Sequence, residues 1–293
     1  MSNILIIDLD STIPNLALKK IEKYHKDKGD TVEWNNELMR YYADKIYVSC
    51  VFDWNKPKCK EWENDPKCEI GGSGYSLEKK LPPEIEEIKP RINWGFTTRG
   101  CIRNCDFCIV PQKEGKIRIV GDIYDIWDGK AKEIMILDNN ILALPKHFGL
   151  IASQIKKEHI RVDFNQGLDC RLLTEDICEL LSSISHREYH FAFDDIKLKP
   201  QVEKAINLLQ QQGINRCIWY VLVGFNSTIE EDLERLNFLR DRNQNAFVQR
   251  YTGYKDKKYI PIARWANQHH IFQAMTWEQF INRPENIKYK PLF

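Results

Sequence analysis

Short apolar segments at a regular spacing constrain the fold of this chain more than any other feature. The pattern of each segment is typical of a buried strand; the segments cover residues 92–98, 133–139, 161–166, 188–195, 217–225 and 246–251. From the second onward they recur about every 28 residues, which is the length of one strand–helix unit. Strands that alternate with helices in this way predict an α/β fold with a parallel sheet.

Helical patterns fill the gaps between these strands. TEDICELLSSI begins at Thr174, which is placed as a cap, and STIEEDLERLNFLRD carries Thr228 and Glu231 at capping-box spacing. KPQVEKAINLLQQQG has Gly213 just past its apolar positions, where helices commonly end. Six such units predict a partial (β/α)6 TIM-like barrel over residues 86–252, an open version of the barrel that closes with eight.

A smaller unit precedes this barrel. NILIIDL predicts a buried strand, residues 13–29 have helical spacing that ends near Gly29, and TVEW and DKIYVSCVF predict two further strands. We therefore expect a small Rossmann-like α/β domain over residues 1–85, joined by a proline-rich linker. The aromatic-rich residues 253–293 are expected to form a C-terminal extension that packs on the barrel.

The charge balance excludes strong electrostatic partners. The chain has 43 Lys plus Arg against 42 Asp plus Glu, so nucleic acid is not indicated and no membrane partner is expected. The apolar run at the N-terminus is short and lacks a cationic lead-in, which predicts a cytoplasmic protein. In a reducing compartment, nine cysteines indicate metal binding, catalysis or core packing rather than disulfides.

Three of those cysteines lie within eight residues. The stretch RGCIRNCDFCIVPQKEGKIR places Cys101, Cys105 and Cys108 at C-x3-C-x2-C spacing. Thiolates suit zinc, copper(I) and iron–sulfur clusters, and four of them complete a [4Fe–4S] site. Three leave one iron without a protein ligand. A zinc site completed by a distant cysteine and an iron–sulfur electron carrier or sensor, both without enzymatic activity, remain alternatives.

The motif, with Phe107 before its last cysteine, resembles the cluster loop of the radical S-adenosylmethionine (radical SAM) enzymes. The resemblance implies that Cys101, Cys105 and Cys108 bind a [4Fe–4S] cluster whose fourth iron stays open for S-adenosylmethionine. The reduced cluster would then cleave that cofactor to a 5′-deoxyadenosyl radical, which takes hydrogen from a substrate that the sequence does not identify. It also implies an electron donor such as flavodoxin or ferredoxin.

The text around the motif is similar to the methylthiotransferase branch and to the branch with a cobalamin-binding-like domain, so methylthio or methyl transfer is an alternative outcome. His25 lacks the D-x-H-x-x-G context of a cobalt ligand; cobalamin is disfavoured and His25 is expected on a helix surface. Cys50, Cys59 and Cys68 do not match the spacing of a second cluster, which is also disfavoured.

Polar residues follow the predicted strands, where ligands of such barrels bind. By resemblance, LDNNIL contributes Asp138, Asn139 and Asn140 to binding of S-adenosylmethionine, and FNQGLDCRLL contributes Asn165 and Arg171. Phe107 is assigned to the same cofactor, whereas no catalytic residue is assigned. Cys170, Cys178 and Cys217 are expected to be core thiols.

Overall fold

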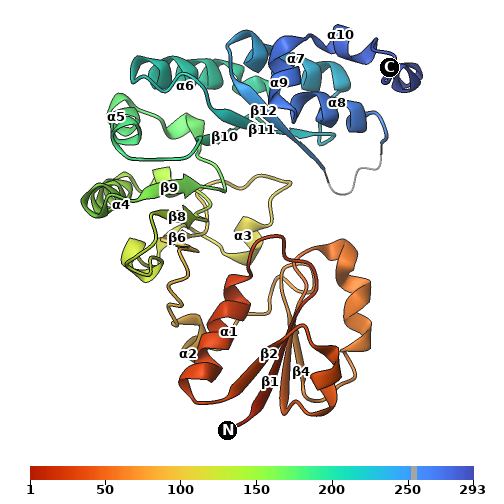
Figure 1. Cartoon of the computed structure of the whole chain (residues 1–293). Coiled ribbons are helices and arrows are strands. Elements are labelled where there is room, and N and C mark those ends of the chain that lie inside the picture. The colour runs from red at the N-terminus through yellow and green to blue at the C-terminus, as the bar shows by residue number, and fades with distance from the viewer. Residues whose placement is uncertain (252–255) are drawn as a thin grey trace.

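A computed structural model describes residues 1–251 and 256–293 and shows an α/β protein built on parallel sheets (Figure 1). The N-terminal unit holds β1 (Asn3–Asp8), β2 (Thr31–Trp34), β3 (Lys45–Ser49) and β4 (Cys68–Gly71). Their order is β2-β1-β3-β4, and each neighbouring pair is parallel. The strands predicted from NILIIDL, TVEW and DKIYVSCVF are confirmed. The fourth strand, β4, was not predicted.

The two faces of this sheet are covered differently. Helix α1 (Leu16–Asp27) places Leu18 and Ile21 against Ile4 and Ile6. On the other face, the 3-10 helix η2 (Asp53–Glu61) contributes Cys59 to a core that is completed by Leu5, Ile7, Ile46, Val48, Cys50, Trp62 and Ile70. The short elements η1 (Glu37–Tyr41) and α2 (Pro83–Glu86) complete the unit.

His25 was expected on a helix surface, and this is wrong. The ring is only 9% exposed, since His25 follows Leu18 and Ile21 on the buried face of α1. Its Nδ1 lies 2.8 Å from an Asp30 carboxylate oxygen and its Nε2 lies 3.1 Å from the Tyr47 hydroxyl. Buried and bonded at both nitrogens, His25 links α1 to β3.

Each of the predicted strand segments after residue 90 contains a strand. β5 (Trp94–Gly95), β8 (Glu133–Ile136) and β9 (Arg161–Phe164) form one parallel sheet. β10 (His190–Ala192), β11 (Ile218–Val223) and β12 (Asn245–Arg250) form another. Isolated parallel bridges, one of them between Leu168 and Phe191, lie between the two sheets. The strands do not close into a barrel within the described residues.

Helices follow the strands at the predicted intervals. They are α4 (Pro145–Glu158), α5 (Glu175–Ser183), α6 (Lys199–Gln211) and α7 (Ile229–Asp241), with the short turns η3 (Ile123–Asp125), η4 (Ile141–Ala143), η5 (Cys170–Leu172) and η6 (Ile196–Leu198). The predicted caps are present: Thr174 accepts from the backbone of Ile177, and Thr228 with Glu231 forms a capping box.

One core joins these strands to the C-terminal helices α8 (Tyr259–Ala266), α9 (His269–Ala274) and α10 (Trp277–Ile281), which η7 (Ile287–Leu292) follows. Trp265, Phe272 and Phe280 belong to it, as do Cys170, Cys178 and Cys217, which confirms these three as core thiols. The expected boundary at residues 252/253 lies outside the described residues, and the expected domain limits stay predictions. No helix of the described part is both long and apolar enough to cross a bilayer.

Candidate functional site

The three clustered cysteines lie in one loop, residues 100–117, which we call the cluster loop. The antiparallel pair β6 (Thr98–Arg99) and β7 (Arg118–Ile119) closes it at its base, and α3 (Val110–Lys113) lies within it. Gly100 has a φ of +82°, and a Cβ there would overlap the carbonyl oxygens of Gly115 and Lys116. Glycine is therefore needed where the chain enters the loop.

Hydrogen-bond donors converge on the first thiol of the loop. The backbone N–H of Arg103 and the side-chain amide of Asn140 donate to Cys101 Sγ at 3.3 Å and 3.5 Å. Donors of this kind stabilise a thiolate. Burial raises the pKa of the Cys105 thiol, and the neighbouring Cys108 raises it further. Burial also raises the pKa of Cys108. Bound iron would overcome both shifts, since a coordinating thiol is deprotonated outright.

A buried carboxylate, Asp169, ties this loop to the segment that follows β9. It accepts from Arg103 Nε at 2.9 Å, from Arg171 Nε at 2.6 Å and from the Asn140 amide at 3.3 Å. Burial alone would raise the pKa of Asp169, but the hydrogen bonds and charges of Arg171 and Arg103 outweigh it and lower that pKa. Sequence reasoning missed Asp169, although it lies within the FNQGLDCRLL segment that pointed to Arg171.

Two of the residues assigned to S-adenosylmethionine are engaged within the protein, Asp138 with backbone N–H groups and Asn139 with the Glu114 side chain. Asp138 accepts from the backbone N–H groups of Thr97 at 2.7 Å and Thr98 at 2.9 Å. Burial raises its pKa. Asn139 donates to Glu114 at 2.7 Å, and Glu114 also accepts from the N–H of Gly100. Both residues brace the base of the cluster loop, and their assignment to the cofactor stays a prediction.

Asn140 differs from these two residues. Its side-chain oxygen is buried and has no hydrogen-bond partner among the described residues, although its amide nitrogen is engaged at Cys101 and Asp169. A buried oxygen in this state favours a ligand that carries an N–H or O–H group. Three thiols beside an unpaired acceptor fit a [4Fe–4S] cluster with an amino-acid ligand on its open iron.

The remaining residues assigned to S-adenosylmethionine, Phe107 and Asn165, contact residues of β11 and of the segment after it. The backbone carbonyl of Asn165 accepts from the Tyr220 hydroxyl at 2.9 Å, and the Phe107 ring packs edge-on against Phe225 at 5.5 Å between centroids.

Asp194, to which the sequence assigned no role, follows β10. Burial raises its pKa, and its charge in turn contributes to the raised pKa of Cys105 and of Cys108.

The N-terminal cysteines do not form a second group of this kind. Cys50 and Cys59 are neighbours in one core, where burial, with Cys59 beside it, raises the pKa of Cys50 to about 12. Cys68 pairs in register with Ile46, four positions before Cys50. At about 3.3 Å per residue that offset is about 13 Å along the strand. Across residues 1–251 and 256–293, no three His, Cys, Asp or Glu side chains are placed to hold one single metal ion, and this includes the cluster-loop cysteines, which would each bind a separate iron of a cluster.

Taken together, the loop, its donors and its position after a parallel strand define a class of protein, an α/β protein with a three-cysteine loop that fits an iron–sulfur cluster. No model of a known protein family matches the chain. Curated relatives named tRNA-2-methylthio-N(6)-dimethylallyladenosine synthase are similar to it. The relative from Flavobacterium johnsoniae is 32% identical over 239 residues, which is 68% of this chain and 47% of the relative. That from Aquifex aeolicus is 29% identical over 160 residues, 49% of this chain and 32% of the relative.

These similarities confirm the resemblance of this chain to the radical SAM enzymes, in the branch of the methylthiotransferases. The predicted cofactors, a [4Fe–4S] cluster and S-adenosylmethionine, are those of that class of enzyme. The chain spans less than half the length of the relatives it matches. Their names give tRNA as what they act on, so they do not support the expectation that nucleic acid is not indicated.

Proposed function

We propose that this chain is a radical SAM enzyme that holds a [4Fe–4S] cluster on Cys101, Cys105 and Cys108. The single observation that carries the proposal is the loop itself: three thiols, with N–H donors on Cys101 and an unpaired buried oxygen of Asn140 beside them. No fourth cysteine is close in sequence; the next, Cys170, is a core thiol. One iron then remains for S-adenosylmethionine.

The surrounding residues would hold that cofactor in place. Asn140 would accept from its amino group, and Arg171 would approach its carboxylate while Asp169 fixes the direction of the guanidinium. Phe107 and Asn165 would line the walls around its adenosine part. When bound and reduced, the cluster supplies one electron that cleaves the sulfonium and gives a 5′-deoxyadenosyl radical for hydrogen abstraction.

We further propose that β5, β8, β9, β10, β11 and β12 act as one partial (β/α)6 barrel over residues 86–252. The parallel bridge between Leu168 and Phe191 supports this, because it lies between β9 and β10 and so relates the two sheets. Residues 1–85 would form a separate Rossmann-like domain and residues 253–293 an extension on the barrel. A small iron–sulfur or flavin protein would deliver the electron.

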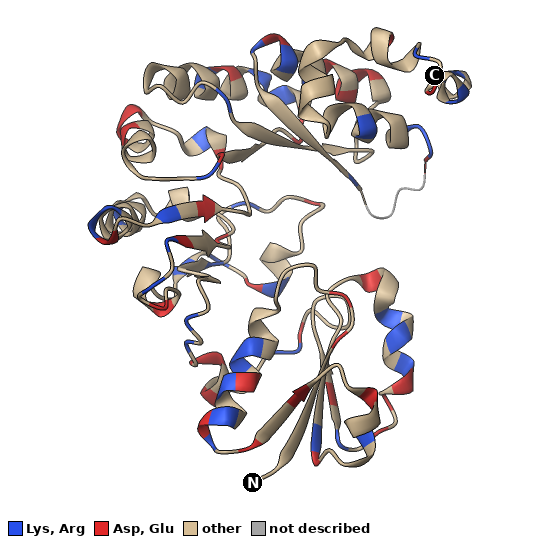
Figure 2. Cartoon of the chain, viewed as in Figure 1, with Lys and Arg blue, Asp and Glu red and all other residues tan. Residues whose placement is uncertain are grey.

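The relatives suggest the substrate. Proteins named as synthases of a methylthio-adenosine in tRNA favour an adenosine of tRNA as the site of modification and methylthio transfer as the outcome. A sulfide-level donor would supply the sulfur after hydrogen abstraction, the electron released as the C–S bond forms would return to the cluster, and a second S-adenosylmethionine would supply the methyl group. A tRNA substrate would place the enzyme in the cytoplasm. The charge balance is nearly neutral, and Figure 2 shows Lys and Arg interspersed with Asp and Glu along the chain. Binding of this RNA would therefore rest on local groups rather than on one broad basic face.

The test is anaerobic reconstitution of the full chain with iron and sulfide, followed by reduction in the presence of S-adenosylmethionine and tRNA that lacks the methylthio group. We expect 5′-deoxyadenosine and a methylthio-adenosine in the digested tRNA by mass spectrometry. The Cys101→Ala/Cys105→Ala/Cys108→Ala variant should give neither. A colourless protein with one tightly bound zinc would contradict the enzyme class, whereas 5′-deoxyadenosine without RNA product would contradict only the substrate.

A further inference from the structure

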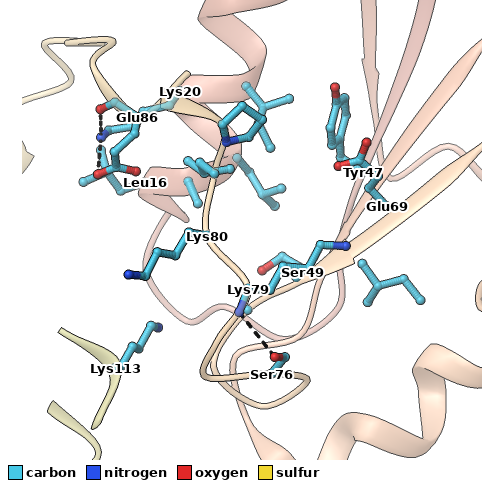
Figure 3. Close-up of a pocket in the computed structure, with 18 of the residues that line it drawn as sticks. Leu16, Lys20, Tyr47, Ser49, Glu69, Ser76, Lys79, Lys80, Glu86 and Lys113 are labelled. Atoms are coloured by element: carbon cyan, nitrogen blue, oxygen red, sulfur yellow. Dashed lines mark hydrogen bonds and ion pairs between the residues drawn. The ribbon is translucent and has the colours of Figure 1, made fainter. Parts of the chain in front are cut away.

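A cavity of about 580 Å³ lies at the carboxyl end of the N-terminal sheet (Figure 3); Glu114 of the cluster loop lines it, whereas the cysteines of that loop do not. Its walls come from three segments of the chain: α1, the ends of β3 and β4 with the loop that follows, and the base of the cluster loop. A second cavity of about 360 Å³ shares Leu16, Lys20 and Arg99 with it. The volume is that of a site for a small organic ligand.

The cavity lies over the β3–β4 half of the sheet face on which α1 packs. Tyr47 and Ser49 of β3 and Glu69 and Gly71 of β4 line the cavity, whereas α1 packs on Ile4 and Ile6 of β1. Parallel strands are ordinarily covered on both faces. Open parallel sheets bind their ligands outside the carboxyl ends of the strands, which is where these residues lie.

The loop after β4 forms the opposite wall. Gly72 has a φ of +97°, and a Cβ at Gly72 or Gly74 would overlap the backbone of Cys50 or Phe52, so the chain turns back tightly there. This turn brings an apolar segment across the cavity, where Leu77 and Leu81 face Leu16 and Ile21 of α1 among the lining residues. The result is an apolar wall beside a polar sheet end.

Cations with different pairing states line the cavity, among them Lys20, Lys79, Lys80, Arg99 and Lys113. Lys20 pairs with Glu86 at 3.0 Å and Arg99 with Glu114 at 2.9 Å. Lys79, Lys80 and Lys113 also line the cavity, and none of the ion pairs among the described residues includes them. In Figure 3 the ammonium groups of Lys80 and Lys113, which come from separate segments, lie on the same side of the cavity.

Lys113 carries the most weight among these cations because it is half-buried. Burial, with the charge of Arg99, lowers the pKa of Lys113, and the charge of Glu114 offsets this only in part. An anionic group in the cavity would supply the missing charge. Phosphate is the group of that charge that several converging lysines commonly bind.

The floor of the cavity offers fixed hydroxyl groups and the Glu69 carboxylate, which pairs with Lys45. The Tyr47 ring is held in place by its hydroxyl contact with His25, which Asp30 holds in turn. Ser49 Oγ accepts from the Asn15 amide at 2.8 Å, which leaves its hydroxyl hydrogen to donate. Groups of this kind suit the hydroxyls of a sugar.

We propose that this cavity binds a nucleotide, free or as one unit of an RNA strand. Its phosphate would lie at Lys80 and Lys113, its base against Leu77 and Leu81, and its ribose near Ser49 and Glu69. This site is separate from the cluster loop cysteines and does not depend on the cluster. Binding can therefore be measured without turnover, and the failure of either proposal leaves the other intact.

The experiment is calorimetric titration of the reconstituted full chain with each of the four ribonucleoside monophosphates, with S-adenosylmethionine present throughout to fill its own site. Adenosine, inorganic phosphate and a short oligoribonucleotide are titrated in parallel. We expect saturable binding of at least one monophosphate, with adenosine and phosphate each at least about tenfold weaker, because neither fills both parts of the cavity. Tighter binding of the oligonucleotide identifies an RNA strand as the source.

Lys80→Ala/Lys113→Ala should weaken binding at least about tenfold with an unchanged melting temperature, since two charge-assisted contacts are lost. The matched control is Lys60→Ala, an exposed lysine of η2 outside the cavity, which should change nothing. If the double variant lowers the melting temperature, the charge-reversing Lys80→Glu is tested alone. The proposal is overturned if neither the monophosphates nor the oligonucleotide bind saturably, or if the lysine variants bind as the wild type does.

Discussion

Two regions of this molecule each hold three cysteines, and their surroundings differ. Cys101, Cys105 and Cys108 are half-exposed in a loop braced by Glu114 and Asp169, with N–H donors on one sulfur. Cys50 and Cys59 are fully buried among apolar side chains, and Cys68 lies four strand positions away from Cys50. The comparison predicts that only the first set binds a cluster, because hydrogen-bond donors, access and strand register differ between the two sets.

Replacing thiols in each of the two sets is the strongest way to break this comparison. Cys101→Ala/Cys105→Ala/Cys108→Ala should lose essentially all iron after anaerobic reconstitution, because every protein ligand is gone. Cys68→Ser should keep about four irons per chain, the content of one [4Fe–4S] cluster. Iron and sulfide analysis measures both. About eight irons in the wild type, reduced to four by Cys68→Ser, would show that the N-terminal thiols also bind a cluster.

Alkylation of the metal-free protein sharpens the same contrast. At pH 8 we expect the cluster-loop thiols to react with iodoacetamide at least about 100-fold faster than Cys50 and Cys59, since buried groups react only through local opening. The pKa of Cys50 is raised to about 12, so at pH 8 its thiol stays protonated and unreactive. Burial also raises the pKa of Cys105 and of Cys108, so the difference in access carries most of the expected contrast. Peptide mass spectrometry over time measures each rate, and equal rates would contradict the difference in burial.

Much of the fold follows from local sequence pattern. Thr174, Thr228 and Glu231 cap helices where the sequence predicted, because a cap depends on residues three or four positions apart. β4 was missed because CEIG is short and half polar. The signal for the burial of His25 was present, since it shares a helix face with Leu18 and Ile21.

The candidate site was less predictable because its contacts span long distances in the chain. The motif spacing points to the three thiols directly. Asp169, by contrast, meets Arg103 across 66 residues of sequence, and no local pattern encodes that ion pair. Because polar residues that follow parallel strands lie at the carboxyl edge of the sheet, the sequence could place Asp138 and Asn140 at that edge. Which of the two side chains lies beside the thiols depends on packing between distant segments, and only the structure shows that it is Asn140.

Asp169→Asn tests whether the brace around the cluster loop matters. The change keeps the side-chain shape but leaves Arg103 and Arg171 without a carboxylate, so we expect 5′-deoxyadenosine formation to fall by about 10- to 100-fold while iron content is retained. Asp241→Asn is the control, an exposed carboxylate paired with Arg240 on α7. Unchanged activity in Asp169→Asn would show that the brace has no role in the reaction.

The smallest expected effect concerns the entry to the cluster loop. Gly100→Ala should destabilise the protein by about 2 kcal/mol or more, because the left-handed backbone and the overlap with Lys116 both oppose a Cβ. Gly115→Ala is the matched control: its φ is +72° and a Cβ there meets nothing within 4 Å, so only about 1 kcal/mol is expected. Urea unfolding measures both, and equal losses would remove the steric argument.

The central claim is that three cysteines leave one iron open for S-adenosylmethionine. Electron paramagnetic resonance of the reduced, reconstituted protein tests this most directly, with spectra taken before and after the cofactor is added. We predict that S-adenosylmethionine changes the spectrum of the cluster in the wild type. A cluster spectrum that stays the same at saturating S-adenosylmethionine would contradict the claim and indicate an electron carrier or sensor instead.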